Sequence, residues 1–480
     1  MASILSAART QKTPNIIAIE NSVVDLQYDD AAGDAVLKND LFSHLREYIE
    51  SAGHAAGFED NPRAGDMCLI SAEAFDGGLI AFGKAKNLLS AADQTLDSVT
   101  QAEIVRTAVF GPAHPVAGGS LANTFHTLMN VRVNGASLVN GAFITAVGQD
   151  SYGKIFEQSL SGHIIAKERG RQLVCHVFPT GNDRILIATP SKTNPAEGHI
   201  TTDLIDGKIT ADVSRIMIGG FLFFTGRFQD VMDKVIDDVS AIDEAQRPTL
   251  VMTAAAQSVA EQPLFRAEFN KAARAADLIV HANTGEFRRL MDMDTDWRVP
   301  FHPAFKGLKG QDLEAAKEAH TAYQDAKKQA NIDAIASATA LSAHIKETYG
   351  RDLKFVVTNG SREIYTITAE APFGAHKPHK IDKSQIVNTV GAGDNFAAGF
   401  QLGDLYGLPH ANSVRMGAEL AASVIQIPSA RLDDQKSQEL TLGKLPHVLS
   451  GGLGYLTKEA LGLAPLSPAA QPKANTPKPR

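Results

Sequence analysis

The sequence predicts an α/β protein in which helices cover a mostly parallel sheet. Short runs rich in β-branched residues alternate with stretches of helical apolar spacing along most of the 480 residues. One pair of alternating runs, 172–178 and 184–189, flanks Thr180-Gly181-Asn182-Asp183, which is a good signal for a hairpin turn. Because the other runs are separated by helical stretches, their strands are expected to lie parallel to one another.

The first strand is expected at residues 15–19, and a helix with apolar spacing is expected at 40–52. Residues 57–113 are rich in Ala and Gly with weak periodicity, and we expect them to be an insertion. Further strands are expected at 142–147, 215–223, 249–253, 277–282 and 354–358. Helices should connect these strands, so the sheet is expected to continue across most of the chain.

Three regions depart from this alternation. Residues 297–311 have the composition of a loop, and 312–348 are a long helical stretch rich in Ala, Lys and Glu that we expect to be a surface appendage. From Pro465 onward the chain is rich in Pro, Ala and Lys, so it cannot bury enough surface to order itself. The expected organisation is one domain over residues 1–450 with insertions near 57–113 and 297–348, followed by a segment over 451–480 that is disordered from about 465.

Composition argues against several classes of function. The chain has 46 basic and 54 acidic residues, a formal net charge of -8 and no block of Lys and Arg, so nucleic acid and anionic membranes are poor principal partners. Its two cysteines, Cys68 and Cys175, lack metal-ligand spacing, which argues against a disulfide framework or a cysteine zinc site. No apolar run approaches the roughly 18 residues of a membrane span, and the first dozen residues lack the apolar core of a secretory signal. We therefore expect a cytoplasmic protein.

The most informative segment is 388–400, Asn-Thr-Val-Gly-Ala-Gly-Asp-Asn-Phe-Ala-Ala-Gly-Phe. Gly391 and Gly393 allow a sharp turn with converging N–H groups, and the positive end of the following helix favours an anion there. Asp394 would lie beside a bound phosphate, ionised at neutral pH and able to accept a proton from a substrate hydroxyl. This arrangement suits phosphoryl transfer. On spacing alone, a helix capped by Asp after a glycine turn explains the segment equally well.

A second group of residues suits the recognition of hydroxyl groups. Gly118 and Gly119 permit a ligand to approach the backbone closely, and Asn123 can both donate and accept hydrogen bonds from the vicinal hydroxyls of a sugar. Asp25, just past the first strand, could accept hydrogen bonds from the same hydroxyls. A glycine turn before a buried helix and an Asp in a turn are the structural alternatives.

The third group follows two of the expected strands. Asn283 and Glu286 lie at the carboxyl end of the strand at 277–282, where α/β proteins bind ligands, and could hold Mg²⁺ through its water molecules. A helix start with a capping Asn and an acid in its first turn is an equal alternative. Residues 357–361, which include Thr358 and Gly360, indicate a strand end followed by a turn.

In this order, these segments resemble the ribokinase-like (PfkB) family of carbohydrate and nucleoside kinases, and residues 147–153 are similar to its V-G-x-D-x-x-G segment. The resemblance runs from residue 15 to residue 429 and implies a three-layer α/β/α fold with a mostly parallel central sheet and a small β lid. The activity it implies is that of a phosphotransferase with an alcohol group as acceptor. It implies the following roles: Asp25, Gly118, Gly119 and Asn123 bind the acceptor, Asn283, Glu286, Thr358, Gly360 and Asn388 lie on the ATP and Mg²⁺ side, Gly391, Ala392 and Gly393 form an anion hole, and Asp394 is catalytic.

Within the family, the chain is most similar to the bacterial inosine-guanosine kinase branch. The similarity lies in four segments, 51–54, 117–126, 388–389 and 429–432, and Asn388 is notable because most members carry Asp there. The resemblance to this branch implies transfer of the ATP γ-phosphoryl group to the 5′-hydroxyl of a purine nucleoside, with inosine or guanosine expected first. Adenosine kinases and sugar kinases of the ribokinase or fructokinase type remain alternatives, as does a non-catalytic nucleoside or sugar sensor.

The same resemblance implies ATP and Mg²⁺ as cofactors and a small nucleoside or sugar as partner, with a homodimer as a candidate assembly. Two departures from the family pattern bear on this. Asn388 removes a negative charge that many members place near a monovalent cation, which leaves a requirement for K⁺ open. Glu20 stands where many members have Gly, so the turn after the first strand is expected to differ.

Overall fold

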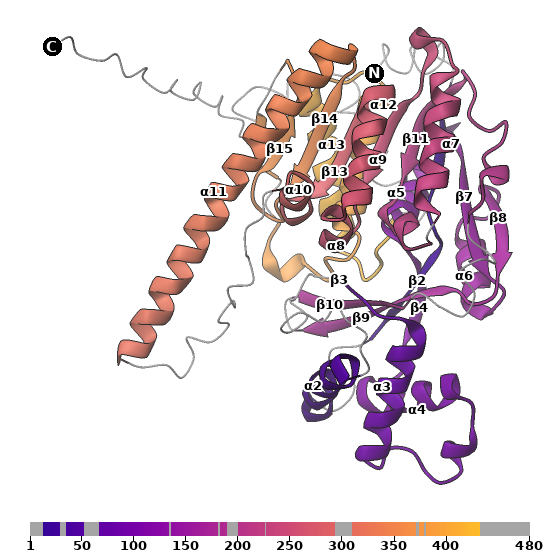
Figure 1. The fold of residues 1–480 in the computed structure, drawn as a ribbon, viewed down its shortest axis with the longest axis vertical. Helices are drawn as coiled ribbons and strands as arrows, with labels where there is room; N and C mark the ends of the chain where they lie inside the picture. The colour runs from indigo at the N-terminus through magenta and orange to yellow at the C-terminus, as the bar shows by residue number, and fades with distance from the viewer. Residues whose placement is uncertain are drawn as a thin grey trace.

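The structure is a computed structural model, and it describes residues 13–28, 35–51, 67–133, 136–180, 183–189, 200–225, 227–292, 310–370, 374–378 and 381–432. Its centre is a nine-stranded sheet with the order β16-β15-β14-β13-β12-β11-β1-β7-β8 (Figure 1). All neighbours from β14 to β8 are parallel, whereas β15 and β16 are antiparallel additions at one edge. The strands are β1 (Asn15–Ile19), β7 (Asn140–Gly148), β8 (Ile164–Arg169), β11 (Val213–Ile218), β12 (Thr249–Thr253), β13 (Leu278–Asn283), β14 (Leu353–Thr358), β15 (Ile364–Ile367) and β16 (Gly374–His376).

Helices cover both faces of this sheet, because its central strands are apolar on both sides. In β11, Met217 packs into one core while Ile216 and Ile218 pack into the other, as the alternation of side chains along a strand requires. The core containing Met217 is closed by α5 (Ser120–Asn130), α6 (Ser151–Ser159), α12 (Ala392–Leu405) and α13 (His410–Val424). The other is closed by α7 (Phe228–Ser240), α8 (Gln257–Ala260), α9 (Pro263–Ala275), α10 (Thr284–Leu290) and α11 (Gly310–Tyr349). These three layers confirm the predicted fold class.

A second sheet of five strands lies below the large one in Figure 1 and corresponds to the predicted lid. Its order is β3-β10-β9-β2-β4, and its strands are β2 (Val23–Gln27), β3 (Met67–Leu69), β4 (His114–Gly118), β9 (Leu173–Thr180) and β10 (Asp183–Thr189). The antiparallel pairing of β9 with β10 confirms the predicted hairpin, whose Gly181 and Asn182 fall outside the described residues. Asp25 lies inside β2, so the alternative that placed it in a turn is wrong.

Three helices pack beneath the lid, within and before the region expected to be an insertion. They are α2 (Ala35–Ser51), α3 (Ala72–Ala85) and α4 (Ser98–Phe110). Their core includes an aromatic stack in which the ring centroid of Phe178 lies 4.8 Å from Tyr28 and 4.3 Å from Phe110. The periodicity of α3 is weak because glycines replace apolar side chains where helices touch: a Cβ on Gly83 would lie 2.2 Å from Val105.

Some elements have other limits than the sequence predicts. The helix expected at 40–52 already begins at Ala35, and the strand expected at 215–223 ends at Ile218. A 3₁₀ helix follows over Gly220–Thr225, where a Cβ on Gly220 would lie 1.9 Å from the carbonyl oxygen of Ala254. Two backbones therefore touch at this point, and the chain leaves the sheet.

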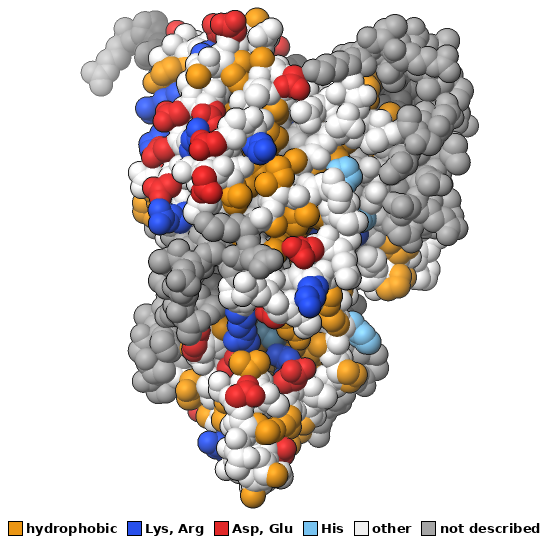
Figure 2. All heavy atoms as spheres, turned by 90° about the vertical axis from the view of Figure 1, so that its right-hand side faces the viewer, with side chains coloured by type: hydrophobic (Ala, Val, Ile, Leu, Met, Phe, Trp, Pro, Cys, Tyr) orange, Lys and Arg blue, Asp and Glu red, His pale blue; other side chains and the backbone are white. Residues whose placement is uncertain are grey.

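The helical stretch predicted at 312–348 is confirmed as α11, whose first half extends away from the body in Figure 1. Most of the loop expected at 297–311 and the whole segment from 451 onward lie outside the described residues. Among the helices that the structure describes, none is long and apolar enough to cross a membrane. On the face shown in Figure 2, acidic and basic side chains are interspersed among the coloured residues.

The helix pair α12 and α13 packs so closely that glycine is required between them. A Cβ on Gly399 would lie 2.6 Å from the carbonyl oxygen of Met416 and 2.7 Å from the Cα of Gly417. Gly399→Ala should therefore lower the free energy of unfolding by about 1 to 3 kcal/mol, although Ala is the better helix former. Urea denaturation measures the change, with Gly170→Ala as control because a Cβ there meets no atom within 4 Å. Equal stability of both variants would contradict this packing.

Candidate active site

A cavity of about 550 Å³ lies between the lid and the carboxyl ends of the large sheet. The lid contributes Asp25 and Cys175, and the ends of β12, β13 and β14 contribute Thr253, Asn283 and Thr358. The first turns of α5 and α12 complete the wall. The N-termini of two helices and the carboxyl ends of parallel strands therefore meet in one cavity. This is where proteins of this architecture bind anions and other ligands.

Asp394 lies in the first turn of α12, at the centre of this cavity. The helix starts at Gly391, whose φ of 78° and close approach to Ala430 leave no room for a side chain: a Cβ would lie 2.1 Å from the Ala430 carbonyl oxygen. Gly391, Ala392 and Gly393 line the cavity together with Asp394. The predicted glycine turn thus presents the first N–H groups of a helix beside a carboxylate.

The carboxylate of Asp394 is held by the first turn of α5. Ser120 Oγ donates a hydrogen bond to its Oδ1 at 2.6 Å, and Asn123 Nδ2 donates to its Oδ2 at 2.8 Å. Residues three apart on a helix share a face, which explains why both side chains reach the same group. The sequence predicts Asn123 but misses Ser120, which is the first residue of the helix, directly after the glycine pair.

The glycine pair before α5 allows Asp25 and the first turn of α5 to lie close together. Gly119 has a φ of 91°, and a Cβ on Gly118 would lie 2.2 Å from the carboxyl carbon of Asp25. Asp25 itself is 8% exposed and lines the cavity, as do Gly119 and Asn123. Gly118 is the packing surface for Asp25 and does not itself line the cavity.

Arg431 is a buried residue of the site for which the sequence predicts no role. Its Nε donates to Asn123 Oδ1 at 2.7 Å, and its Nη2 donates to the carbonyl oxygen of Gly118 at 3.3 Å. Burial lowers the pKa of Arg431 to about 10, although the charges of Asp25 and Asp394 favour its protonated form. It follows α13 in a segment without a motif, and the similarity of 429–432 to the inosine-guanosine branch was the only sequence signal.

Glu20, the departure at the end of β1, is fully buried beneath the site. Its carboxylate accepts hydrogen bonds from the backbone N–H groups of Leu121 at 3.0 Å and Phe221 at 3.4 Å. Burial raises the pKa of Glu20 to about 8, and the nearby charge of Asp394 acts in the same direction while the backbone donors oppose it. Its side chain fills the space beside Gly219, where a Cβ would lie 1.9 Å from Glu20 Oε1.

Asn283 and Glu286 form a capping box at the start of α10. Asn283 Oδ1 accepts from the N–H groups of Gly285 and Glu286 at 2.8 and 3.0 Å, and Glu286 Oε2 accepts from the N–H of Asn283 at 2.9 Å. The capping interpretation is confirmed, and both residues also line the cavity. Burial raises the pKa of Glu286 to about 7, and the like charge of Asp394 adds to the shift. A cation at this place would favour the ionised carboxylate.

The remaining predicted residues divide into two groups. Thr358, at the end of β14, and Gly360, in the following turn with a φ of 57°, both line the cavity. Asn388 is not among the lining residues: its Nδ2 donates to the carbonyl oxygen of Pro428 at 3.0 Å, and its Oδ1 accepts from the N–H of Val390 at 2.9 Å. Within the described residues, no three His, Cys, Asp or Glu side chains are grouped to hold a metal ion.

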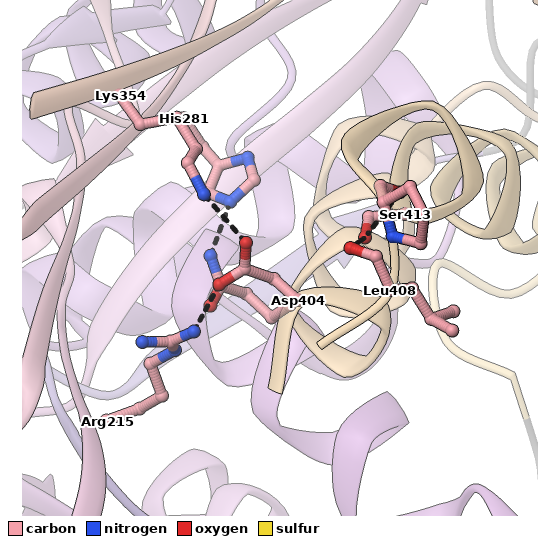
Figure 3. A network of polar contacts seen from close by, with 8 residues as sticks. Arg215, His281, Lys354, Asp404, Leu408 and Ser413 are labelled. Carbon is pink, nitrogen blue, oxygen red and sulfur yellow. Dashed lines mark hydrogen bonds and ion pairs between the residues drawn. The ribbon is translucent and has the colours of Figure 1, made fainter. Parts of the chain in front are cut away.

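The far end of α12 is anchored to the sheet, as Figure 3 shows. Asp404 pairs with Arg215 of β11 and with Lys354 of β14, at 2.7 Å from the lysine Nζ. Although burial raises the pKa of Asp404, these two cations outweigh it and hold the pKa below its usual value. One turn earlier, Gln401 Nε2 lies 2.8 Å from Nε2 of His281, a ring that burial keeps neutral by lowering its pKa to about 3.

Comparison with known proteins agrees with this geometry. Residues 313–437 match the family model described as pfkB family carbohydrate kinase. No curated protein sequence matches the chain. The fold of a probable sugar kinase from Rhizobium etli CFN 42 is similar, with a TM-score of 0.56, 18% identity and coverage of 91% of this chain and 100% of that one.

Two adenosine kinases have similar folds as well. For the enzyme from Sinorhizobium meliloti the TM-score is 0.54 at 18% identity, covering 89% of this chain and 98% of that one. For the enzyme from Schistosoma mansoni in complex with 2-fluoroadenosine, the TM-score is 0.54 at 12% identity, covering 87% of this chain and 97% of that one. The fold and the matched segment define the class: a phosphotransferase that acts on an alcohol group. Within that class, residues 313–437 carry the sequence pattern of the PfkB kinases.

Replacing Glu20 by Gln should remove a pH-dependent cost of burial. Because the pKa of Glu20 is raised from 4.5 to about 8, the folded protein keeps a proton that the unfolded chain loses, and wild-type stability falls as the pH rises through this window. Glu20→Gln is neutral at every pH, so its stability relative to wild type should rise by more than about 1 kcal/mol between about pH 5 and pH 8. Urea denaturation at each pH measures it. A difference that does not change with pH would contradict the buried neutral carboxyl.

Proposed function

We propose that the protein is an ATP-dependent kinase that phosphorylates the 5′-hydroxyl of a purine nucleoside, with inosine or guanosine as the preferred acceptor. The observation that carries the proposal is the position of Asp394, at the start of α12, with its carboxylate between Ser120 and Asn123 in a cavity that also contains Asp25 and Glu286. One side of this cavity suits a sugar, and the other suits the phosphates of a nucleotide.

The lid side supports a nucleoside over a free sugar. Cys175 of β9 and Leu186 of β10 line the cavity together with Phe221 and Val390, and these side chains belong to one apolar cluster. A free sugar has no planar apolar group to place against such a wall, whereas a nucleobase buries both faces of its ring on apolar and aromatic side chains. Asp25, which also lines the cavity, would accept hydrogen bonds from ribose hydroxyls.

The proposed chemistry is a single displacement on the γ-phosphorus of ATP. The acceptor hydroxyl gives its proton to Asp394, its oxygen bonds to the γ-phosphorus, and the bond to the bridging oxygen of ADP breaks. The N–H groups around Gly391, Ala392 and Gly393 stabilise the charge on the equatorial phosphate oxygens. Positioning and electrostatics supply most of the acceleration because the transition state is loose.

The ATP side is proposed to lie along Thr358, Gly360 and the start of α12. Glu286 and Asn283 would hold Mg²⁺ through its water molecules, because a cation stabilises the ionised form of a buried carboxylate whose pKa is raised. When bound, Mg²⁺ neutralises the charge of the β and γ phosphates. We include no K⁺ site, because the neutral amide of Asn388 is occupied by backbone groups away from the cavity.

The acceptor is identified by incubating the protein with Mg-ATP and inosine, guanosine, adenosine, ribose or fructose in parallel. Phosphorylated inosine or guanosine supports the proposal, and phosphorylated adenosine or sugar assigns the chain to another branch of acceptors. Binding of a nucleoside or sugar without product identifies a sensor that has lost transfer and overturns the proposed activity.

Asp394→Asn should abolish turnover while keeping acceptor affinity. The amide preserves the shape of the side chain but cannot accept the hydroxyl proton, so kcat should fall by about 10² to 10⁴. Calorimetric titration measures acceptor affinity, and single-turnover kinetics measures transfer. Turnover within a few-fold of wild type would remove Asp394 from the catalytic role.

Asp25→Ala should weaken acceptor binding by about 10- to 100-fold, because ribose hydroxyls lose a charged hydrogen-bond acceptor in a buried place. The matched control is Asp76→Ala, which removes a buried carboxylate of α3 that pairs with Arg171 and does not line the cavity. It should lower stability without changing acceptor affinity. Equal acceptor affinity of Asp25→Ala and wild type would show that Asp25 does not hold the ribose.

A further inference from the structure

Ala430 and Arg431 connect the starts of two helices that are far apart in sequence, α12 and α5. The carbonyl oxygen of the preceding residue, Ala430, accepts a hydrogen bond at 2.9 Å from Asn395 Nδ2 in the first turn of α12. The side chain of Arg431 itself donates a hydrogen bond to Asn123, in the first turn of α5. Arg431 is 7% exposed and is not among the residues that line the cavity.

The orientation of the Asn123 amide follows from its two neighbours. A guanidinium can only donate hydrogen bonds and an ionised carboxylate can only accept them. Since Arg431 Nε lies 2.7 Å from Oδ1 of Asn123, the amide must direct its Nδ2 toward Asp394, and that nitrogen lies 2.8 Å from Asp394 Oδ2. A flipped amide would place two donors together at Arg431 and two acceptors together at Asp394. Arg431 therefore determines which end of Asn123 meets the carboxylate.

The charge of Arg431 acts on the same carboxylate. Acidic side chains that act electrostatically on Asp394 or Arg431 approach from three elements: Glu20 at the end of β1, Asp25 in β2 and Glu286 in α10. His126 on α5 also faces Arg431, and burial keeps that ring neutral by lowering its pKa to about 3. Once they are ionised, Glu20 and Glu286 repel a negative charge on Asp394, whereas the guanidinium of Arg431 attracts it.

We propose that Arg431 is a positioning residue for phosphoryl transfer: it fixes the Asn123 amide and keeps Asp394 ionised, so that Asp394 can accept the proton of the acceptor hydroxyl. This inference rests on the proposed function. Arg431 touches neither reactant. It should therefore act on kcat and on the pH dependence of kcat, and should leave the KM for ATP nearly unchanged.

The test compares Arg431→Gln and Arg431→Lys with wild type over the pH range in which kcat falls on the acid side. In Arg431→Gln, the loss of the attracting charge should move this acid limb to higher pH by about one unit, with a fall in kcat of about 10- to 100-fold at neutral pH. Arg431→Lys keeps the charge but not the planar donor group. Its acid limb should stay within a few tenths of a unit of wild type, while its kcat lies between the other two.

Arg288→Gln is the matched control for the loss of a buried arginine. Arg288 is 6% exposed and donates to the side-chain oxygen of an asparagine, Asn331, at 2.6 Å, as Arg431 does to Asn123. This variant should lose stability in urea denaturation and leave the acid limb where it is in wild type.

Two results would overturn the role of Arg431. One is an acid limb in Arg431→Gln that coincides with wild type, and the other is the same displacement of the limb in Arg288→Gln. If Arg431→Gln does not fold, a displaced acid limb in Arg431→Lys equally overturns the charge argument. The proposed function fails separately: a wild-type protein that makes no product with any acceptor removes it, and the inference on Arg431 falls with it.

Discussion

The contact between the first turns of α5 and α12 is the constraint on which the site depends. Ser120 and Asn123 meet the two oxygens of Asp394 only because both helices begin at the same point of the sheet edge. Glycine allows each start: Gly119 turns the chain into α5, and Gly391 packs against Ala430 where α12 begins. A side chain at Gly391 would collide with the carbonyl oxygen of Ala430, and one at Gly119 would be strained by its positive φ. The backbone conformation at the two helix starts therefore determines the geometry around the Asp394 carboxylate.

This arrangement brings more acid together than a protein interior readily accepts. Glu20, Asp25 and Glu286 are all less than a tenth exposed, and the pKa values of Glu20 and Glu286 are raised, first by burial and then by the charge of Asp394. Such a site is unfavourable for folding and favourable for binding cations, because any positive group that enters relieves the repulsion. Arg431 supplies a permanent positive charge that acts on Asp25 and Asp394. Beside Glu286, a bound cation would relieve the same repulsion.

The parts of the site that the sequence predicts are those where backbone and chemistry coincide. Glycines next to an acid or an amide indicate helix starts, so the sequence predicts that Asp394, Asn123 and Glu286 lie at the beginnings of helices. The limits of the strand at 249–253 were also predicted without error. No role could be predicted for Ser120 and Arg431, since each acts only through a contact made over a long sequence separation. The weak periodicity of α3 has a similar origin, because its glycines encode close packing and not an apolar face.

The relative position of lid and body is fixed at the short connection between β1 and β2. Glu20, Asn21 and Ser22 are each fully buried and polar, and each is tied to a different element: Glu20 to the start of α5, Asn21 to the carbonyl oxygen of Phe221 at 2.7 Å, and Ser22 to Gln172 beside β9. A polar group buried at this place must keep its partner, so the connection resists displacement. Asp25 lies three residues after Ser22, so this connection also fixes its position. With α12 anchored at its far end by Arg215 and Lys354, the separation between Asp25 and Asp394 is determined by buried hydrogen bonds on both sides of the cavity.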